Sequence, residues 1–344
     1  MKRALITGIA GQDGSYLAEF LLAKGYDVFG LVLRDEPLRW IDPIKDRLIL
    51  MEGDLRNQKS LDHAVRQALP DEVYHLGALP FVAISWKQPV LTADVNALGT
   101  TRLLEALRSI TPHARIYHAS TSEMFGLTEE IQTEEGLFHP RNPYSISKCY
   151  SHWIAVNYRE SYDMYVCCGI MFNHESPRRG ENFVTRKIAR GVVDIKEGKQ
   201  DCLYLGNLDV WRDWGYASEY VEVMWLMLQQ DAPDDYIIST GEVHTVREFL
   251  EEAFCVVGLD AERNGKKGIE EAYIRKDNGQ AVVRISPEFF RPVELTVLRG
   301  SNSKAKGKLK WEPKTRFREL VRIMVDYEMQ NTRPTQSIRE VKRR

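Results

Sequence analysis

The strongest constraint on the fold is the order of strands and helices that the first half of the sequence predicts. "RALITG" (residues 3–8) predicts a buried strand, and "SYLAEFLLAKG" (15–25) follows with the period of an amphipathic helix that ends at Gly25. Further strands are predicted at 27–33, 48–55, 72–78, 115–120 and 165–173, with helices near 59–69, 92–109 and 144–161. This alternation predicts an α/β fold of the Rossmann type, with a doubly wound parallel sheet covered by helices on both faces.

The second half is less regular and predicts a smaller C-terminal α/β domain. Residues 236–241 still predict a strand, whereas 257–285 are polar and glycine-rich and predict a loop or a hairpin. We therefore expect a first domain of residues 1–175 and a second of mainly 176–344, with segments near 211–243 returning to the first.

Composition excludes several classes of protein. The 344 residues are 43% hydrophobic and 28% charged with a net charge of −2, so we expect a globular protein without nucleic-acid or membrane partners. No apolar run approaches the roughly 18 residues of a membrane span, and the apolar run in "MKRALITGIAG" is too short for a secretory signal. The five cysteines lack C-x-x-C spacing, which predicts reduced thiols in the cytoplasm.

A glycine turn follows the first strand. In "TGIAGQDG" the glycines Gly8, Gly11 and Gly14 open the first helix, with the spacing G-x-x-G-x-x-G rather than G-x-G-x-x-G. Glycine lets the backbone approach a pyrophosphate, and the N–H groups of the helix N-terminus bind it. This context predicts a dinucleotide site.

The end of the second strand indicates which dinucleotide binds. Val32 and Leu33 stand where an acid would accept a hydrogen bond from a ribose 2′-hydroxyl, and Arg34 follows them with a guanidinium that can pair a 2′-phosphate. Asp35 and Glu36 follow at once and oppose that charge, so NADP is expected over NAD but NAD stays open. Asp54, after the third strand, is placed either to contact the adenine or to cap a turn.

Two polar segments supply candidate catalytic groups. "HASTSEMFG" (118–126) ends a strand with the hydroxyls of Thr121 and Ser122 and the carboxylate of Glu123, and strand ends border the ligand crevice of such a sheet. "NPYSISKCYSHW" (142–153) places Tyr144 four residues before Lys148, on one helical face. A phenol becomes a usable base when a nearby positive charge stabilises its phenolate. The spacing alone also fits an ordinary helix surface.

Nearly the whole chain resembles the extended short-chain dehydrogenase/reductase superfamily and, within it, the GDP-mannose 4,6-dehydratase family. The motifs of the first half are common to the superfamily, whereas "NHESPRRGENFVTRK" is specific to the GDP-mannose dehydratase branch. The segments that carry the resemblance are "ALITGIAGQDGSYLAEFLL", "NALGTTRLLEALR", "STSEMFG", "FNHESPRRGENFVTRKIARG", "GNLDVWRDWGYASEYVE" and "FFRPVELTVLRGSNSKAKGKLKWEPK".

The resemblance implies conversion of GDP-mannose to GDP-4-keto-6-deoxy-mannose with a catalytic NADP. Tyr144, held as phenolate by Lys148, would take the C4 hydroxyl proton while hydride leaves C4. Glu123 would remove the C5 proton and help to expel the C6 hydroxyl as water, and the hydride would return to C6. Thr121 would hydrogen-bond the C4 oxygen. A simple dehydrogenase has no task for Glu123, so this residue argues for dehydration.

The resemblance and the glycine turn together give candidate binding residues. For the cofactor they are Gly8, Gly11, Gln12, Asp13, Gly14, Arg34, Asp54, Leu55, Leu76, Tyr144, Lys148, Asn173 and Arg179. For the substrate they are Ser122, Asn173, Phe183, Val184, Lys187, Arg212, Arg291 and Glu294. Arginine and lysine suit a diphosphate because they supply fixed positive charge. The histidines outside "NHES" show no ligand spacing, so no metal is expected.

The chain departs from the family at two loops. In "GALPFV" the residues Leu79 and Pro80 replace the amide and hydroxyl that relatives place beside the hexose. Asp35 replaces the second of two arginines in a loop that helps relatives to form tetramers. We therefore expect a homodimer, with a tetramer as the alternative, and a dimer interface formed as a four-helix bundle by the helices at 92–109 and 144–161.

Three other functions stay open. The chain could be a nucleotide-sugar 4-epimerase, a dehydratase of another GDP-sugar, or a catalytically silent protein that only senses NADP. The complete set of Thr121, Glu123, Tyr144 and Lys148 argues against the sensor, because a sensor needs only the cofactor half of the site.

Overall fold

The computed structural model describes residues 1–128, 130–289 and 297–332, which form two compact units. The first unit contains the described residues of 1–174, 212–243 and 293–314. The second contains those of 175–211, 244–292 and 315–344.

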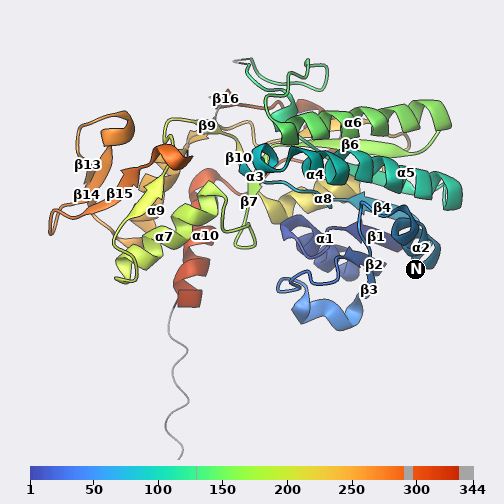
Figure 1. Ribbon diagram of the computed structural model, residues 1–344, viewed down its shortest axis with the longest axis horizontal. Coiled ribbons are helices and arrows are strands. Elements are labelled where there is room, and N and C mark those ends of the chain that lie inside the picture. Colours follow the sequence, from blue (N-terminus) through green and yellow to red (C-terminus); the bar gives the residue numbers. More distant parts are fainter. Residues whose placement is uncertain (129, 290–296, 333–344) are drawn as a thin grey trace, which may run out of the picture. The chain divides into compact units, whose positions relative to one another are not determined.

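A seven-stranded parallel sheet forms the centre of the first unit (Figure 1). Its strands are β1 (Arg3–Thr7), β2 (Asp27–Val32), β3 (Ile49–Glu52), β4 (Glu72–His75), β5 (Arg115–Thr121), β6 (Val166–Met171) and β11 (Asp235–Ile238). Their order is β11-β6-β5-β4-β1-β2-β3, so the winding reverses between β1 and β4. Ligands of such sheets bind where the order reverses, at the carboxyl ends of the strands. The predicted doubly wound sheet is confirmed.

Helices cover both faces of this sheet because the strands are apolar on both sides. Helices α1 (Gln12–Ala23) and α8 (Ala217–Met227) pack on one face with Ala4 and Ile6 of β1. Helices α2 (Gln58–Ala68), α5 (Gly99–Ile110) and α6 (Pro143–Tyr162) pack on the other face with Leu5. Alternate residues of one strand therefore enter two separate cores, as the period of a strand requires.

One predicted helix of the first unit is irregular. The helix expected at 92–109 consists of α4 (Pro89–Ala93), a π-helical turn η2 (Asp94–Leu98) and α5. A π-helical turn inserts an extra residue and frequently marks a functional site. Apolar periodicity does not reveal it, because the flanking turns keep their buried faces.

The second unit contains a mixed four-stranded sheet and three helices. The sheet has the order β13-β14-β15-β8, from β13 (Ala261–Arg263), β14 (Ala272–Arg275), β15 (Ala281–Ile285) and β8 (Leu203–Leu205). The helices are α7 (Val184–Lys196), α9 (Val246–Val257) and α10 (Phe317–Thr332). The segment at 257–285 is thus the hairpin that was one of its two predicted forms.

Short elements complete the described chain. They are η1 (Asp42–Arg47), α3 (Val82–Lys87), η3 (Ser122–Met124), β7 (Asn173–Glu175), β9 (Trp211–Arg212), β10 (Trp214–Tyr216), β12 (His244–Thr245), η4 (Gly268–Glu270), η5 (Pro287–Phe289), β16 (Val297–Leu298) and η6 (Ala305–Leu309). No helix in the described ranges has the length and apolar character needed to cross a bilayer. All five cysteines are free thiols.

Candidate active site

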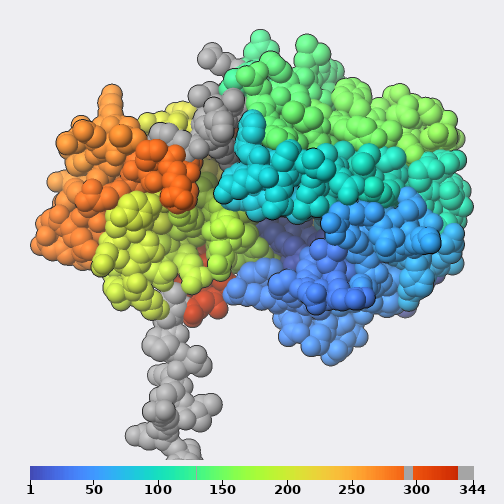
Figure 2. All heavy atoms as spheres, in the orientation of Figure 1, coloured from blue at the N-terminus to red at the C-terminus, as the bar shows by residue number. Residues whose placement is uncertain are grey.

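The glycine turn lies at the point where the sheet order reverses. Gly8 adopts φ +72°, and a Cβ atom there would stand 2.9 Å from the backbone of Gly77, which follows β4. A Cβ on Gly14 would stand 2.3 Å from the carbonyl oxygen of Gly8, and Gly11 is the N-cap residue of α1. No other residue fits at Gly8 or Gly14 without moving backbone. Figure 2 shows a hollow in the first unit between the teal α3–α4 segment and the blue residues that follow β2, with dark-blue N-terminal atoms at its base.

Polar side chains at the start of α1 are held by the segment that follows β6. His174 Nε2 lies 2.8 Å from Asp13 Oδ2, and Gln12 Nε2 donates to Asp13 Oδ1 at 2.9 Å and to the His174 carbonyl at 3.1 Å. The other candidate positions here are apolar: Leu55 is buried, and Leu76 donates its backbone N–H to the Thr7 carbonyl at 3.3 Å. These hydrogen bonds connect the segment that follows β6 to the start of α1, directly after the glycine turn.

The charged residues at the ends of β2 and β3 form ion pairs with each other. Arg34 pairs with Glu52 at 2.9 Å, and Arg56 pairs with Asp54 at 2.6 Å. The Arg56 guanidinium lowers the pKa of the Asp54 carboxyl. Glu52 is a competitor for Arg34 that the sequence did not reveal, because it belongs to the neighbouring strand.

Tyr144 and Lys148 both lie on α6, and their environments differ. Tyr144 is half-buried, whereas the Lys148 side chain is 6% exposed. Burial lowers the pKa of Lys148 from 10.5 to about 8, because a charged ammonium is poorly solvated there. A desolvated positive charge one helical turn from a phenol is well suited to stabilise its phenolate.

Three buried histidines surround Lys148 without adding charge. Burial and the Lys148 ammonium lower the pKa of His75 to about 3, and the same two causes place the pKa of His118 well below its usual range. Burial also lowers the pKa of His152. Hydroxyl groups bond their rings: Thr7 and Thr100 bond His75, Ser151 bonds His118 and Ser120 bonds His152. Since these histidines are neutral at pH 7, they add no positive charge to that of Lys148.

The N-cap residue of α6 connects Glu123 to the helix of Tyr144. Asn142 Oδ1 accepts the Ser145 N–H at 2.8 Å, and Asn142 Nδ2 donates to Glu123 Oε2 at 3.1 Å. Thr121 ends β5, and its Oγ1 accepts the Glu123 N–H at 3.3 Å, which leaves the hydroxyl proton free to be donated. Thr121, Glu123 and the start of α6 therefore meet at one end of the sheet. Ser122, between them, is buried.

The π-helical turn fixes the loop that departs from the family. Asn96 Oδ1 accepts the Leu79 N–H at 2.8 Å, and Asn96 Nδ2 donates to the Leu79 carbonyl at 3.2 Å and to Ser147 Oγ at 3.1 Å. The buried Asn96 thus holds the backbone of Leu79 whatever its side chain. Sequence reasoning missed Asn96 and Asn142; only the Asn-Pro step before Tyr144, an N-cap followed by proline, was a usable signal for the second.

The second unit contains three of the candidate substrate residues and Arg179. Phe183 is the N-cap residue of α7, Val184 is the first helical residue and Lys187 is the fourth, with its N–H donated to the Phe183 carbonyl at 2.9 Å. The positive end of the helix dipole at this N-terminus favours an anion. Arg179 lies 3.2 Å from Glu175 and 3.8 Å from the centroid of the Phe183 ring. Burial lowers the pKa of Lys187, whose Nζ lies 3.4 Å from the centroid of the Phe289 ring.

The remaining candidates lie elsewhere in the chain. Asn173 begins β7, and Arg212 ends β9 with a buried side chain. Arg291 and Glu294 lie outside the described residues. The binding roles of all these residues stay predictions.

The sheet order, the glycine turn at its reversal and the Tyr144/Lys148 pair on one helix define the short-chain dehydrogenase/reductase class. Solved structures of similar fold agree. A UDP-glucose 4-epimerase from Thermus thermophilus in complex with NAD matches with a TM-score of 0.78 and 28% identity, over 95% of this chain and 98% of that one. A dTDP-glucose 4,6-dehydratase from Streptomyces venezuelae shares the fold with a TM-score of 0.82 and 23% identity, over 96% and 97% of the two chains.

Sequence comparison places the chain within this class. The family model for GDP-mannose 4,6 dehydratase matches residues 5–324. A GDP-mannose 4,6-dehydratase from Yersinia enterocolitica is 48% identical, over 97% of this chain and 95% of the relative. A second, from Vibrio cholerae, is 49% identical over 94% and 93%. The chain belongs to the GDP-mannose 4,6-dehydratase family, which confirms the resemblance.

The burial of Lys148 leads to a prediction about stability. Lys148→Met removes a charge that folding takes from water, so at pH 7, with bound nucleotide removed, the free energy of unfolding should rise by up to about 3 kcal/mol. Between about pH 8 and pH 10.5, the pKa values of Lys148 in the folded and unfolded states, the unfolded parent binds more protons than the folded parent. The stability of the parent therefore rises with pH in this range, and the difference in stability between the variant and the parent shrinks.

Urea unfolding at pH 7 and pH 10 measures this difference. Lys59→Met, at an exposed lysine, is the control and should change little. A Lys148→Met variant less stable than the parent at pH 7 would contradict the account.

Proposed function

We propose that this protein converts GDP-mannose to GDP-4-keto-6-deoxy-mannose. The observation that carries the proposal is the Asn142–Glu123 hydrogen bond at 3.1 Å, which holds a carboxylate beside the first turn of the Tyr144 helix. A 4-epimerase or a simple dehydrogenase needs the tyrosine but has no proton to remove from C5. Family membership and the names of the relatives, GDP-mannose 4,6-dehydratases, support the same substrate.

The first unit suits a nicotinamide dinucleotide. A cradle that a Cβ atom would fill, at Gly8 and Gly14, lets a pyrophosphate approach the backbone, and α1 directs its N-terminal N–H groups to the same place. Asn173, near the nicotinamide, and Arg179, near the phosphates, are further proposed contacts. When bound, the cofactor would accept hydride from C4 and return it to C6, so that it is not consumed.

The chain's own residues would move the protons. Tyr144, its phenolate stabilised by Lys148, takes the proton of the C4 hydroxyl, while the Thr121 hydroxyl keeps its proton and donates a hydrogen bond to the C4 oxygen. The ketone that forms acidifies the C5 hydrogen. Glu123 removes this proton and delivers it to the departing C6 hydroxyl, which leaves as water. C5 regains a proton in the last step, and the proton held by Tyr144 supplies it.

The nucleotide would be held by cations and a helix N-terminus. Phe183, Val184 and Lys187 lie at the start of α7, where the positive end of the helix dipole and the Lys187 ammonium favour a diphosphate. Arg212 supplies a guanidinium with the fork that suits phosphate oxygens. Arg291 and Glu294 complete the proposed set, and Ser122 lies near the sugar.

Two substitutions test the reaction. Tyr144→Phe should lower kcat for GDP-mannose by roughly 10²–10⁴-fold, because the C4 hydroxyl loses its base. Glu123→Gln should still oxidise C4, read as absorbance of reduced nicotinamide, but should not release the 4-keto-6-deoxy sugar. Mass spectrometry of the product, without added nicotinamide, is the measurement. Release of that sugar by Glu123→Gln at the parent rate would remove Glu123 from the mechanism.

A dehydratase of another GDP-hexose is the second candidate, because of the loop that contains Leu79. Asn96 preserves the backbone of Leu79, so the departure from the family is confined to side chains and to the N–H that Pro80 lacks. Incubating the parent with several GDP-hexoses in the same product assay separates the two candidates.

We propose NADP as the cofactor in preference to NAD. Arg34 is 77% exposed and its partner Glu52 is 56% exposed, so a 2′-phosphate can take the place of that carboxylate. Arg34→Ala should weaken NADPH binding roughly ten-fold and NADH binding little, since only NADPH carries the 2′-phosphate. Fluorescence titration measures both. Glu52→Gln is the matched control and should not weaken NADPH; equal losses for both cofactors in Arg34→Ala would exclude the role.

We also propose a homodimer through α6. Ile146, Tyr150 and Trp153 recur on one face of this helix and are 56%, 43% and 58% exposed. Large apolar side chains gathered on one helical face favour association with a second copy. Trp153→Glu should shift the mass measured by light scattering from dimer to monomer. Met1→Glu, at an exposed residue far from α6 in the sequence, should leave it unchanged; a monomeric parent would exclude the dimer.

A further inference from the structure

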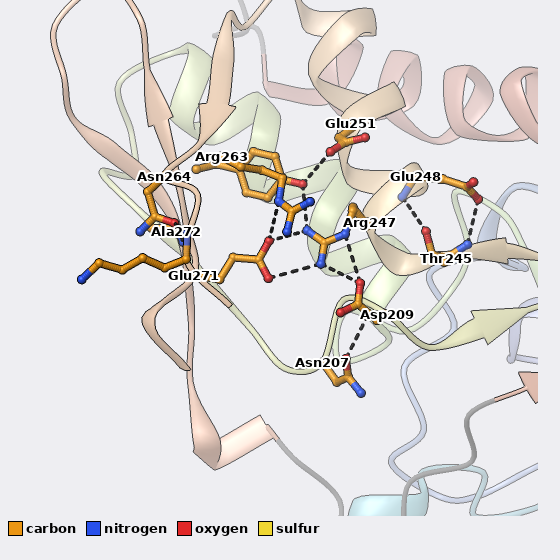
Figure 3. Close-up of polar contacts among 12 residues, drawn as sticks. Asn207, Asp209, Thr245, Arg247, Glu248, Glu251, Arg263, Asn264, Glu271 and Ala272 are labelled. Carbon is orange, nitrogen blue, oxygen red and sulfur yellow. Dashed lines mark hydrogen bonds and ion pairs between the residues drawn. The ribbon is translucent and has the colours of Figure 1, made fainter. Parts of the chain in front are cut away.

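A cluster of polar side chains in the second unit joins the N-terminus of α9 to a hairpin and to a loop (Figure 3). Arg247 is its centre, with a side chain 13% exposed. Its guanidinium pairs Asp209 on one side and Glu271 on the other. One half-buried arginine therefore connects three segments that are distant in the sequence.

The loop side of the cluster involves both side chains and backbone. Arg247 Nη2 and Nε donate to Asp209 Oδ1 at 2.6 and 3.1 Å. The Arg247 N–H also donates to the Leu208 carbonyl at 2.9 Å, and the Val246 N–H donates to the Val210 carbonyl at 3.2 Å. The segment 207–211 is thus held against α9 at three successive residues.

The hairpin side holds Arg247 in place. Glu271, 5% exposed, accepts from Arg247 Nη2 at 3.2 Å and from Arg263 Nε at 2.9 Å. Tyr273 accepts from Arg247 Nη1 at 3.2 Å and donates to Glu251 at 2.7 Å. These bonds leave the Arg247 guanidinium little freedom, so its orientation toward Asp209 is fixed.

Arg212 follows this loop directly in the chain. On its other side, the buried Asp213 accepts the N–H groups of Thr240 and Gly241, each at 2.8 Å. The chain on both sides of Arg212 is therefore held, at Asp209 by Arg247 and at Asp213 by Thr240 and Gly241.

We propose that Arg247 is a positioning residue for nucleotide binding: through Asp209 it locks the 207–211 loop and so pre-orients the Arg212 guanidinium for a diphosphate. This inference rests on the proposed function, because it takes GDP as the group that Arg212 binds. A pre-oriented cation binds more tightly because the cost of ordering it is met during folding rather than during binding.

If Asp209 lay directly beside the diphosphate, its substitution would change the affinity for GDP in the opposite direction. Its carboxylate is 71% exposed and negative, so a position near the diphosphate would weaken binding by repulsion. Removal of that charge would then tighten GDP. A positioning role predicts weaker binding instead, which makes the direction of the change decisive.

Three variants separate the loop side from the hairpin side. Asp209→Ala removes the side-chain contact of the loop with Arg247 and leaves the two backbone hydrogen bonds and the Arg247–Glu271 pair intact. Arg263→Ala is the matched control, because it removes a partner of the same Glu271 without touching the loop. Asp209→Asn keeps an oxygen that can accept a hydrogen bond from Arg247, so this variant should keep most of the parent's affinity for GDP and most of its protection from hydrogen exchange in the loop.

The readouts are the affinity for GDP by calorimetry and amide hydrogen exchange of residues 207–211 without ligand. Asp209→Ala should weaken GDP about five-fold, the order expected for one unrestrained side chain, and should speed exchange in the loop. Arg263→Ala should leave both within two-fold, even if it lowers the melting temperature. The melting temperature of Asp209→Ala should change by only a few degrees, because the Asp209 carboxylate of the Asp209–Arg247 ion pair is exposed to water.

Two results would overturn the inference: unchanged or tighter GDP binding by Asp209→Ala, or equal losses in Asp209→Ala and Arg263→Ala. A parent that does not bind GDP would instead refute the proposed substrate. The exchange experiment needs no ligand, so it would still decide whether Asp209 and Arg247 lock the loop.

Discussion

Burial of the Lys148 ammonium is the constraint on which the candidate active site depends. Its removal from water costs folding free energy, and the same burial lowers its pKa to about 8. The neighbouring histidines add no charge: His75 and His118 are buried with pKa values far below 7, and their hydrogen bonds go to hydroxyl groups. A positive charge in a poorly solvated place is well suited to stabilise a phenolate at Tyr144, one helical turn away on α6.

Two asparagines turn this charged helix into a site with defined geometry. Asn142 caps α6 and bonds Glu123, so the end of β5 and the start of the helix are fixed together. Asn96, in the π-helical turn, bonds both backbone groups of Leu79 and the hydroxyl of Ser147 on α6. The loop that departs from the family is therefore held by the same helix that carries Tyr144. Because both bonds go to the Leu79 backbone, a change of side chain there leaves the backbone held.

The same principle recurs among the residues proposed to bind the nucleotide, whose side chains or neighbouring loops are held by other residues. Arg179 lies between Glu175 and the ring of Phe183, and Arg247 fixes the loop before Arg212. Long cationic side chains lose much conformational freedom when they bind a phosphate. Partners that restrict them beforehand reduce this loss.

The sequence by itself determined the features that depend on neighbours in the chain. Strand–helix alternation predicted the parallel sheet, the glycine spacing predicted a turn that only Gly8 and Gly14 allow, and four-residue spacing put Tyr144 and Lys148 on one helix. These patterns can be read because periodicity and backbone sterics are local.

Only the tertiary structure decided which distant groups meet. It gave Arg34 the partner Glu52 from the next strand, placed histidines around Lys148, and joined Asn142 to Glu123 and Arg247 to Asp209. Hydrogen bonds and ion pairs act over about 3 Å. The two residues of the Arg34–Glu52, Asn142–Glu123 and Arg247–Asp209 pairs are nevertheless 18, 19 and 38 positions apart in the sequence. No local pattern fixes such distances; the packing of helices and strands does.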